Sequence, residues 1–573
     1  MKRSAFVFLL VLVLLSLASC SKGKIYPYRW VYVSKGLHDD RDVEEIREIA
    51  RTASEHGLDG ILLSAGLDRL DLQPPDYFRR LKEVQGICGQ YSLDIIPSVF
   101  SVGYGSGLGH NKNLAAGFPV KDALFLVKKG EAKLLADPPV AILNGSFEET
   151  GKDRVKGFIC PADSFPQVIF IDKNVFRDGK SSLRFENGTK HPEQAGRISQ
   201  EVSVSPYRSY RLTCWIKTED LDIDGENFRE GRFSGNIRLY AEGAEDKREL
   251  VRYDPRMPMT GDWRKVSAGF NSLNYGKVII SASASGGTRG RFWLDSLSLE
   301  EVGLTNILRR PGTPLVVWSD KDGTVYEEGK DFAPVADPEL NCYFDHDGPV
   351  IKGLPGGRIK DGERLRVSWY HGMSVPVNKH QVTVCMSEPE LYDYWRLQVK
   401  LIQENLAPKM YFLPQDEIRA GGYCKACKER NMTMGQILGD CITRQCSMIK
   451  EVNPQAKILA WSDMLDPNHN AGPKVGKYYY LVDGLFDGSW NYVPKDLIMT
   501  CWGRSASMES LEHFSGLGFR ILGAAYYDTD DLKDVKGWLE ALDKTPTSCG
   551  IMYTTWQDKY ALLAEFGDMV SKR

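Results

Sequence analysis

Residues 29–64 read RWVYVSKGLHDDRDVEEIREIARTASEHGLDGILLS, and this stretch predicts the fold. Its first six residues form an apolar run, a charged helical pattern follows over 42–56, and its last five residues form a second apolar run. The alternation continues with a helical pattern over 75–91 and a third apolar run over 94–100. Strands that alternate with helices usually pair in parallel, so these residues predict βαβαβ, the start of a parallel sheet.

The same alternation returns in the last third of the chain. Apolar runs are again separated by helical patterns, one of them from about 433 to 452. Five of these runs are typical of strands: 409–414, 457–465, 497–502, 520–527 and 550–556. Together with the first three they make eight, which predicts an α/β fold of the (β/α)8 TIM barrel type with its active site at the C-terminal ends of the strands.

Between residues 141 and 302 the helical periodicity largely disappears. Short alternating runs such as 210–216 and 277–283 replace it, which is typical of an antiparallel all-β sandwich. The sequence therefore predicts a barrel interrupted by an inserted jelly roll. The expected divisions are 25–138 for the first part of the barrel, 139–303 for the sandwich, 304–377 for an irregular connecting excursion and 378–573 for the rest of the barrel.

The inserted segment resembles the carbohydrate-binding jelly rolls of the family 4/9 type. The stretches that carry the resemblance are 144–148, 179–184, 210–217, 262–266 and 292–297. The resemblance implies a fold, because these are mostly core and turn positions, and we expect Trp215 and Trp293 to be buried rather than to be sugar platforms. It leaves open whether the sandwich binds glycan or only braces the barrel.

Two adjacent carboxylates, Asp416 and Glu417, follow the apolar run 410–414. An Asp-Glu dipeptide on an ordinary loop is commonly a solvated pair, but at the end of a barrel strand it lies where such folds assemble their active sites. A general acid needs a raised pKa, which a neighbouring carboxylate and aromatic walls supply through like charge and desolvation. The pair therefore indicates glycoside chemistry.

The C-terminal half resembles the catalytic barrel of glycoside hydrolase family 20, the β-N-acetylhexosaminidases. The residues that carry the resemblance are a Ser-x-Pro-x-x-Tyr segment at 387–392, the Asp416-Glu417 pair, Trp461 with Asp463, Trp502 and Trp556. The resemblance implies that Glu417 protonates the departing oxygen and that Asp416 orients the substrate's own 2-acetamido group as the nucleophile. It also implies that Tyr526 or Tyr527 steadies the acetamido oxygen.

The resemblance further implies a set of substrate-binding residues, since aromatic faces suit the apolar faces of sugars. The predicted set is Trp461, Asp463, Trp502, Tyr526, Tyr527, Trp556 and His371. Two members have an alternative interpretation. Asp463 could cap a helix, and His371 could be a structural histidine whose hydrogen bonds are made within the fold.

Two departures from common patterns keep other functions open. A conventional retaining barrel carries a nucleophilic Glu near the end of its seventh strand, and the stretch 524–530 contains no Glu. This favours a nucleophile supplied by the substrate, although Asp528 could still act as a nucleophile of the protein. The His-x-Gly-Gly that usually precedes the Asp-Glu pair is replaced by residues 412–415, Phe-Leu-Pro-Gln. The alternatives are a glycosidase of other specificity in which Glu388 or Asp528 partners Glu417, and a non-catalytic surface glycan-binding lipoprotein.

The first twenty residues predict export. A basic start precedes an apolar stretch over 5–17, which is shorter than the roughly 20 residues that a membrane span needs. The sequence Leu-Ala-Ser-Cys at 17–20 resembles a bacterial lipobox, in which Cys20 is lipidated. We therefore expect an exported lipoprotein at the outer membrane or cell surface, attached to the membrane only through its lipid.

Composition and cysteine spacing restrict the partners. The formal net charge is -3 and no basic cluster is present, so we expect no nucleic acid as a partner. The resemblance to glycoside hydrolase family 20 implies a glycan substrate. Cys424 and Cys427 form a C-x-x-C with Cys441 and Cys446 nearby, which leaves zinc, a disulfide or packed thiols open. Because the second pair is not C-x-x-C and no histidine lies close, we expect neither a metal nor an organic cofactor.

Overall fold

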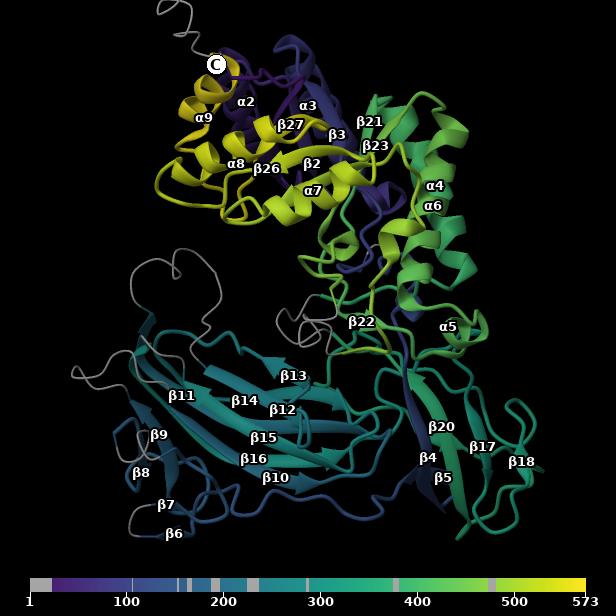
Figure 1. The fold of residues 1–573 in the computed structure, drawn as a ribbon. Helices are drawn as coiled ribbons and strands as arrows, with labels where there is room; N and C mark the ends of the chain where they lie inside the picture. Colours follow the sequence, from purple (N-terminus) through teal and green to yellow (C-terminus); the bar gives the residue numbers. More distant parts are fainter. Residues whose placement is uncertain are drawn as a thin grey trace, which may run out of the picture.

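The computed structural model describes most of the chain. The described residues are 23–105, 107–151, 154–161, 167–186, 196–223, 237–284, 288–374, 381–472 and 481–573. The expected signal segment and its lipidation site, Cys20, lie outside them. Figure 1 shows a sheet with its helices at one end of the molecule and two antiparallel assemblies at the other end.

The eight strands expected for a parallel sheet are confirmed. They are β1 (Tyr28–Ser34), β2 (Gly60–Ser64), β3 (Asp94–Pro97), β21 (Met410–Leu413), β23 (Lys457–Trp461), β25 (Ile498–Trp502), β26 (Arg520–Ala524) and β27 (Ser548–Tyr553). Their order is β21-β23-β25-β26-β27-β1-β2-β3, and all seven pairings are parallel. The outer strands also approach each other, because the Val99 amide donates to the Phe412 carbonyl at 2.9 Å. The fold is therefore mixed α/β with a nearly closed eight-stranded parallel sheet.

Both faces of this sheet are buried. Alternate side chains point to opposite faces, and the inner face is filled by a cluster that includes Trp30, Phe412 and Trp461. The outer face packs against the helices in a larger cluster that includes Val31, Tyr411 and Ile521. Strands that are covered on both sides are continuously apolar, which explains why the sequence located them.

The helices cover the outer face of the parallel sheet (Figure 1). They are α2 (Asp40–Glu55), α3 (Pro75–Gln90), α4 (Pro389–Leu406), α6 (Met434–Val452), α7 (Met508–Gly516), α8 (Lys533–Lys544) and α9 (Leu563–Ser571). The short helix α5 (Lys425–Glu429) lies away from the parallel sheet, near β22 (Ala420–Gly421) (Figure 1). Asp39 caps the start of α2, and Thr433 with Gln436 forms a capping box on α6. None of the helices in the described residues combines the length and apolar character needed to cross a membrane.

The inserted segment forms two antiparallel sheets, as in a sandwich. One sheet has the order β10 (Arg197–Ser203), β15 (Lys277–Ala284), β12 (Ile237–Gly243) and β13 (Glu249–Tyr253). The other has the order β14 (Gly261–Asn271), β11 (Ser209–Ile223), β16 (Thr288–Glu301), β9 (Ser182–Glu186) and β8 (Ile169–Asp172). Inward-facing residues of both sheets share one apolar core. A small hairpin, β6 (Thr150–Gly151) and β7 (Arg154–Val155), precedes them.

The two tryptophans of the sandwich differ in exposure. Trp293 is buried as expected, and its Nε1 donates to Asp172 at 2.9 Å. Trp215 is half-buried, and the guanidinium of Arg177 lies over its ring at 4.6 Å. One face of the Trp215 ring is therefore covered by a cation, and the Trp293 ring is not available as a sugar platform.

The connecting excursion is more regular than the sequence suggested. Residues 304–377, expected to be irregular, contribute β17 (Val316–Ser319), β18 (Val325–Tyr326), β19 (Ile351–Lys352) and β20 (Arg364–His371). These pair with β4 (Phe118–Lys128) and β5 (Glu131–Leu134), in the order β18-β17-β20-β4-β5-β19. The segment 118–134, expected within the barrel, therefore belongs to a separate six-stranded sheet. The structure thus has a third assembly, which frames the two ends of the sandwich insertion.

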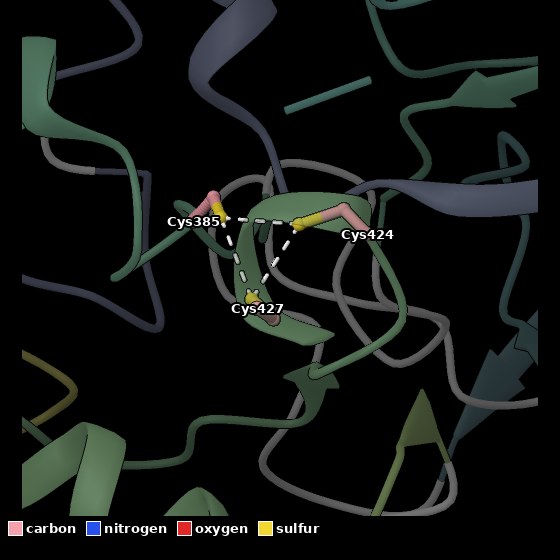
Figure 2. Close-up of side chains that lie close together, drawn as sticks. All are labelled: Cys385, Cys424 and Cys427. Carbon is pink, nitrogen blue, oxygen red and sulfur yellow. Dashed lines mark hydrogen bonds between the residues drawn. The ribbon is translucent and has the colours of Figure 1, made fainter. Parts of the chain in front are cut away.

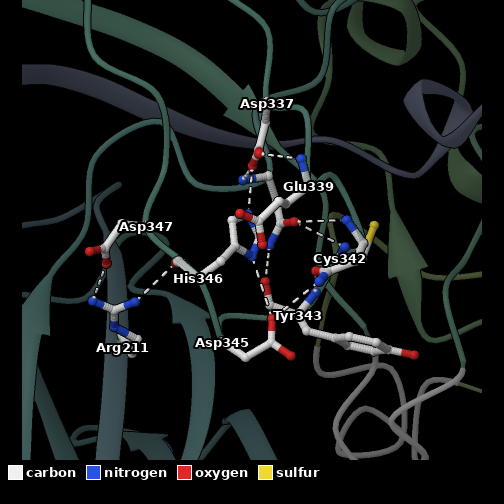
Figure 3. A network of polar contacts seen from close by, with 10 residues as sticks. Arg211, Asp337, Glu339, Cys342, Tyr343, Asp345, His346 and Asp347 are labelled. Atoms are coloured by element: carbon white, nitrogen blue, oxygen red, sulfur yellow. Dashed lines mark hydrogen bonds and ion pairs between the residues drawn. The ribbon is translucent and has the colours of Figure 1, made fainter.

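A polar network fastens this third assembly to the sandwich (Figure 3). His346 Nε2 lies 2.8 Å from Asp337, and Arg211 of β11 binds Asp347 at 2.8 Å and the His346 carbonyl at 3.0 Å. Phe344 lies against β14 at Gly269, where any side chain would overlap its ring. The loop over 337–347 is therefore fixed to the outer surface of the sandwich.

The sandwich also packs against the loop that follows β21. That loop contains β22 (Ala420–Gly421), which pairs with β24 (Leu481–Val482). Ala420 and Leu481 belong to the sandwich core, and Arg248 donates to the Val482 carbonyl at 2.8 Å. The sandwich therefore supports the loop that begins with the predicted carboxylate pair.

Candidate functional site

The carboxylate pair lies in the loop after β21, separated from the strand by Pro414 and Gln415. Glu417 has a left-handed backbone with a φ of 52°, and its amide donates to Asp463 Oδ2 at 3.1 Å. A Cβ at position 103 would lie 2.5 Å from the Asp416 carbonyl oxygen, so Gly103 is needed for this approach. The strained turn and the close backbone contact together fix the direction of both carboxylates.

Glu417 is held by groups from three segments. Its Oε2 accepts a hydrogen bond from the Tyr104 hydroxyl and lies 3.1 Å from Arg419 Nη2. Gln381 donates to the Glu417 carbonyl at 3.0 Å and accepts from Arg419 at 2.9 Å. The Glu417 side chain is 21% exposed and Tyr104 is 42% exposed. The carboxylate is therefore positioned and still reachable from solvent.

Two further carboxyl groups, those of Asp416 and Asp463, lie close to Glu417. Burial, followed by the charges of Asp463 and Glu417, holds the pKa of Asp416 well above its usual value. Burial also raises the pKa of Asp463, although His469 and a hydrogen bond from Asn470 oppose it. Asp416 Oδ1 is buried and has no hydrogen-bond partner among the described residues. Such an atom is costly unless a ligand supplies a donor.

Asp463 connects the acidic site to its aromatic surroundings. It accepts from Asn470 Nδ2 at 2.8 Å and from Trp502 Nε1 at 3.3 Å, in addition to the Glu417 amide. It also begins a short 3-10 helix, Asp463–Leu465, but its carboxylate bonds to the site. The structure therefore favours the site interpretation of Asp463 over the helix-cap interpretation.

Five aromatic side chains form an aromatic cluster at the C-terminal ends of the strands. Its members are Tyr32, Trp461, Trp502, Tyr527 and Trp556. The centroids of neighbouring rings lie between 5.4 Å, for Tyr32 and Trp556, and 6.4 Å, for Tyr527 and Trp556. The cluster adjoins the acids, because the charge of Glu417, after burial, raises the pKa of Tyr527 and the charge of Asp416 contributes to that of Tyr32. Trp461 is 2% exposed and Trp556 is 40% exposed, so the cluster extends from the core to solvent.

Two predicted substrate contacts are not brought to this site. Tyr526 is 2% exposed, donates to the Thr529 carbonyl at 2.7 Å and stacks on Tyr553, because successive residues of an extended chain point to opposite faces. His371 is fully buried at the end of β20, where it lies 3.1 Å from Asn271, and burial lowers its pKa to about 4. Tyr527 is therefore the tyrosine of the site, and His371 is a structural histidine.

The two carboxylates considered as alternative partners of Glu417 have structural roles. Asp528 accepts from Thr555 Oγ1 at 2.5 Å and from the Trp556 amide at 2.9 Å, which shapes the loop after β27. Glu388 forms a buried ion pair with Arg310 at 2.6 Å. Both groups are used to hold loops, so the geometry does not favour either as a nucleophile.

Three residues of the site were not identified from the sequence. Tyr32 lies on β1, two residues after Trp30, so both side chains point to the inner face of the sheet. This spacing was the signal in the sequence that could have identified Tyr32. Arg419 lies two residues after Glu417, and a cation at that spacing could have been noticed. Tyr104 comes from a glycine-containing loop and reaches Glu417 across 313 residues of chain, which no local pattern indicates.

Two other places could bind a ligand. Cys385, Cys424 and Cys427 are the one group of potential metal-ligating side chains found among the described residues. A recess of about 280 Å³ lies between the sandwich and the loop over 337–347, and its lining includes Tyr253, Lys265 and Tyr343. Among the described residues that line it, the one carboxylate is Asp345.

The comparisons with known proteins match only parts of the chain. No protein-family model matches it, and no curated protein matches it. Among solved structures, "Family 16 Carbohydrate Binding Module-2" is 16% identical and covers 28% of this chain and 97% of that chain, with a TM-score of 0.20. "CBM4 structure and function" is 14% identical and covers 28% and 99%, with a TM-score of 0.20. A cyclase from Fischerella sp. TAU is 14% identical and covers 28% and 96%, with a TM-score of 0.22. The function is therefore argued from the site itself.

The buried carboxyl of Asp416 gives a stability prediction. An unfolded Asp ionises near its usual pKa of about 3.9, whereas the folded pKa is raised. A folded pKa that is one unit higher lowers the free energy of unfolding by about 1.4 kcal/mol above that pKa and has no effect below about pH 4. We therefore expect Asp416→Asn to raise the Tm at pH 8, with a gain that fades towards pH 4, as measured by thermal melts across that range.

Asp320→Asn is the matched control, and its expected change in Tm at pH 8 has the opposite sign. The hydrogen bond from Arg366 Nε, at 2.6 Å, lowers the pKa of Asp320, so this carboxylate stabilises the fold above about pH 4. Its replacement should lower the Tm at pH 8 and have little effect at low pH. A Tm for Asp416→Asn below that of the wild type at pH 8 would contradict the burial cost assigned to Asp416.

Proposed function

We propose that the protein is a glycoside hydrolase that removes terminal β-linked N-acetylhexosamine by a substrate-assisted retaining mechanism. In this proposal the nearly closed sheet acts as a (β/α)8 TIM barrel, whose active site lies at the C-terminal ends of its strands. The observation that carries the proposal is the unpartnered Asp416 Oδ1, buried beside Glu417 and near the aromatic cluster. That atom can accept a hydrogen bond from a ligand, and the N–H of a 2-acetamido group can supply one.

Glu417 acts as the general acid. Tyr104 and Arg419 hold its carboxyl at the solvent-accessible side of the site, where it can reach the oxygen that leaves with the aglycone. After the first step, the same group accepts a proton from the incoming water.

Asp416 orients the nucleophile. Its carboxylate accepts the acetamido N–H, which increases the nucleophilicity of the acetamido oxygen towards the anomeric carbon. The Tyr527 hydroxyl, close enough to Glu417 to sense its charge, donates to that oxygen and fixes its direction. The structural roles of Asp528 and Glu388 support this assignment, because neither carboxylate is left to attack the sugar.

The aromatic cluster binds the sugar ring. Trp461 and Trp502 form the deeper wall, and the half-exposed Trp556 forms the rim. Aromatic faces contact the apolar faces of a pyranose and exclude water from the reacting atoms. The arrangement suits a terminal sugar held over the acids.

Hydrolysis of matched nitrophenyl β-glycosides tests the proposal. The substrates of each pair differ only in carrying a 2-acetamido or a 2-hydroxyl group. Turnover confined to the acetamido sugars supports the proposal. Equal turnover of both would replace the borrowed nucleophile with a protein carboxylate, and absence of turnover on all pairs would favour a longer glycan or a binding role.

We expect Trp556→Ala to raise KM by roughly fivefold with little change in kcat, since an aromatic contact of this kind contributes about 1 kcal/mol. Trp556 is 40% exposed, so its removal should leave the fold intact. Phe176→Ala removes a ring of equal exposure from the sandwich and is the control. Steady-state kinetics on the acetamido substrate check the prediction, and a fall in kcat with unchanged KM would contradict a role in binding the ground state.

One observation favours a second candidate function. Arg419, at 3.1 Å, and the Tyr104 hydroxyl hold the Glu417 carboxylate in one orientation, as a nucleophile that attacks the anomeric carbon requires. In that case the enzyme is a retaining glycosidase that forms a covalent glycosyl-enzyme. Mass spectrometry after treatment with a 2-fluoro glycoside distinguishes the two, because only a protein nucleophile becomes labelled.

The proposed location is the outer membrane or cell surface, through a lipid on Cys20. The support comes from the sequence over 1–20. Mass spectrometry of the N-terminal peptide from a bacterial host tests it. An acylated Cys20 that is lost in Cys20→Ala supports the anchor, and an unmodified N-terminus at another residue contradicts it.

A further inference from the structure

Three cysteine thiols from two separate segments of the chain lie close together. Cys385 lies before α4, while Cys424 and Cys427 lie at the start of α5. Their sulfurs are 3.4 Å apart for Cys385 and Cys424, 3.7 Å for Cys385 and Cys427, and 3.4 Å for Cys424 and Cys427. Figure 2 shows the three side chains pointing towards one another. All three are buried.

We propose that Cys385, Cys424 and Cys427 bind one zinc ion as thiolates. A tetrahedral ion with zinc–sulfur bonds of about 2.3 Å places its sulfur ligands about 3.8 Å apart, so small movements would adapt the observed triangle. Thiolates are also the ligands that soft and borderline ions prefer, over carboxylates or carbonyls. The site is thus formed by a C-x-x-C and a distant third cysteine, and not by Cys441 or Cys446, which lie buried on α6.

The surroundings fit a cluster of thiolates. The buried guanidinium of Arg310 lies close enough to Cys385 and Cys424 for each sulfur to affect its pKa. Together with a divalent ion, this cation offsets much of the negative charge of three thiolates, although Arg310 also pairs with Glu388. The buried hydroxyl of Ser387 lies beside Cys427. An oxygen from Ser387 or from water can therefore complete a fourth position.

The position of the triangle indicates a structural role for the ion. The segment of Cys385 also contains Gln381, which bonds to the Glu417 carbonyl and to Arg419. The segment of Cys424 begins with Glu417 itself, and the Cys385 amide bonds to the Leu114 carbonyl from the loop after β3. A zinc ion would thus join the loops that support the carboxylate site without contacting the substrate.

Metal analysis of the purified full-length protein tests this proposal directly. We expect about one zinc ion per chain in the wild type and in Cys446→Ser, which removes a buried thiol elsewhere, and less than about a tenth of an ion in Cys385→Ser and Cys427→Ser. We also expect a chelator to lower the Tm of the wild type and of Cys446→Ser, but not that of the cluster variants.

A second measurement covers the case in which a variant fails to fold. Cobalt substituted into the wild-type protein should give the charge-transfer absorption of a metal bound by three thiolates. Peptide mapping without reduction separates the remaining outcomes. A disulfide between two of the three cysteines, or three free thiols in a metal-free protein grown with zinc, would overturn the proposal. Neither result bears on glycoside hydrolysis, so this test is independent of the proposed function.

Discussion

Glu417→Gln should reduce kcat on an acetamido glycoside by about a hundredfold to ten-thousandfold, the range for loss of a general acid. Glutamine keeps the size and the hydrogen-bonding shape of the side chain, so Tyr104 retains a partner. It cannot donate a proton to the departing oxygen. The loss should shrink for a dinitrophenyl leaving group, which departs without protonation, and steady-state kinetics with graded leaving groups measure this trend.

The matched control for this variant is Glu429→Gln. Glu429 is an exposed carboxylate on the same loop region, paired only loosely with Lys425 at 3.6 Å. The Glu429→Gln variant should retain the kcat and the Tm of the wild type. If Glu417→Gln lost the same factor on all leaving groups, Glu417 would be acting in some step other than proton donation.

Asp416→Asn should reduce kcat/KM on acetamido substrates by about a thousandfold, a loss similar to the removal of one oriented group that stabilises a transition state. The amide cannot accept the acetamido N–H as a carboxylate does, and it presents its own donors to that group. Unlike the loss in Glu417→Gln, this loss should be the same for good and poor leaving groups, because it concerns the nucleophile. Kinetics on the same graded substrates check it.

The raised pKa of Asp416 adds a pH signature. Since the orienting form is the carboxylate, kcat/KM of the wild type should fall as the pH drops through this raised pKa. The acid limb set by Asp416 should be absent from the residual activity of Asp416→Asn. Because the same variant is expected to be more stable than the wild type at neutral pH, lost activity with a raised Tm would separate a functional role from a folding defect. An unchanged acid limb in the variant would assign that ionisation to another group.

The parallel sheet was predictable because its strands are buried on both faces. Stretches such as 60–64 and 410–413 are continuously apolar and are bounded by turn residues, so their local composition is sufficient. The six-stranded sheet was not predicted, since β18 and β19 are only two residues long. Its main partner strands, β4 and β20, are more than two hundred residues apart, with the sandwich between them. Pairing over that distance leaves no local pattern.

The candidate site was predictable where it coincides with strand ends. Trp461, Trp502 and the Asp416-Glu417 pair follow directly from the positions of β21, β23 and β25. The choice between Tyr526 and Tyr527 required the register of the chain, because adjacent residues face opposite sides. The third cysteine of the group Cys385, Cys424 and Cys427 was not predicted. Cys385 is 39 residues from Cys424 in the sequence, and the two come together only in the folded chain.

The most direct test of the central claim is a series of N-acylated β-glycosides in which the acetamido methyl group carries none, one, two or three fluorine atoms. If the substrate's own acetamido oxygen attacks the anomeric carbon, each fluorine withdraws electrons from that oxygen, and kcat/KM should fall steadily along the series. A rate that does not depend on fluorination, or equal turnover of a 2-hydroxyl substrate, would contradict substrate assistance and assign the attack to a carboxylate of the protein.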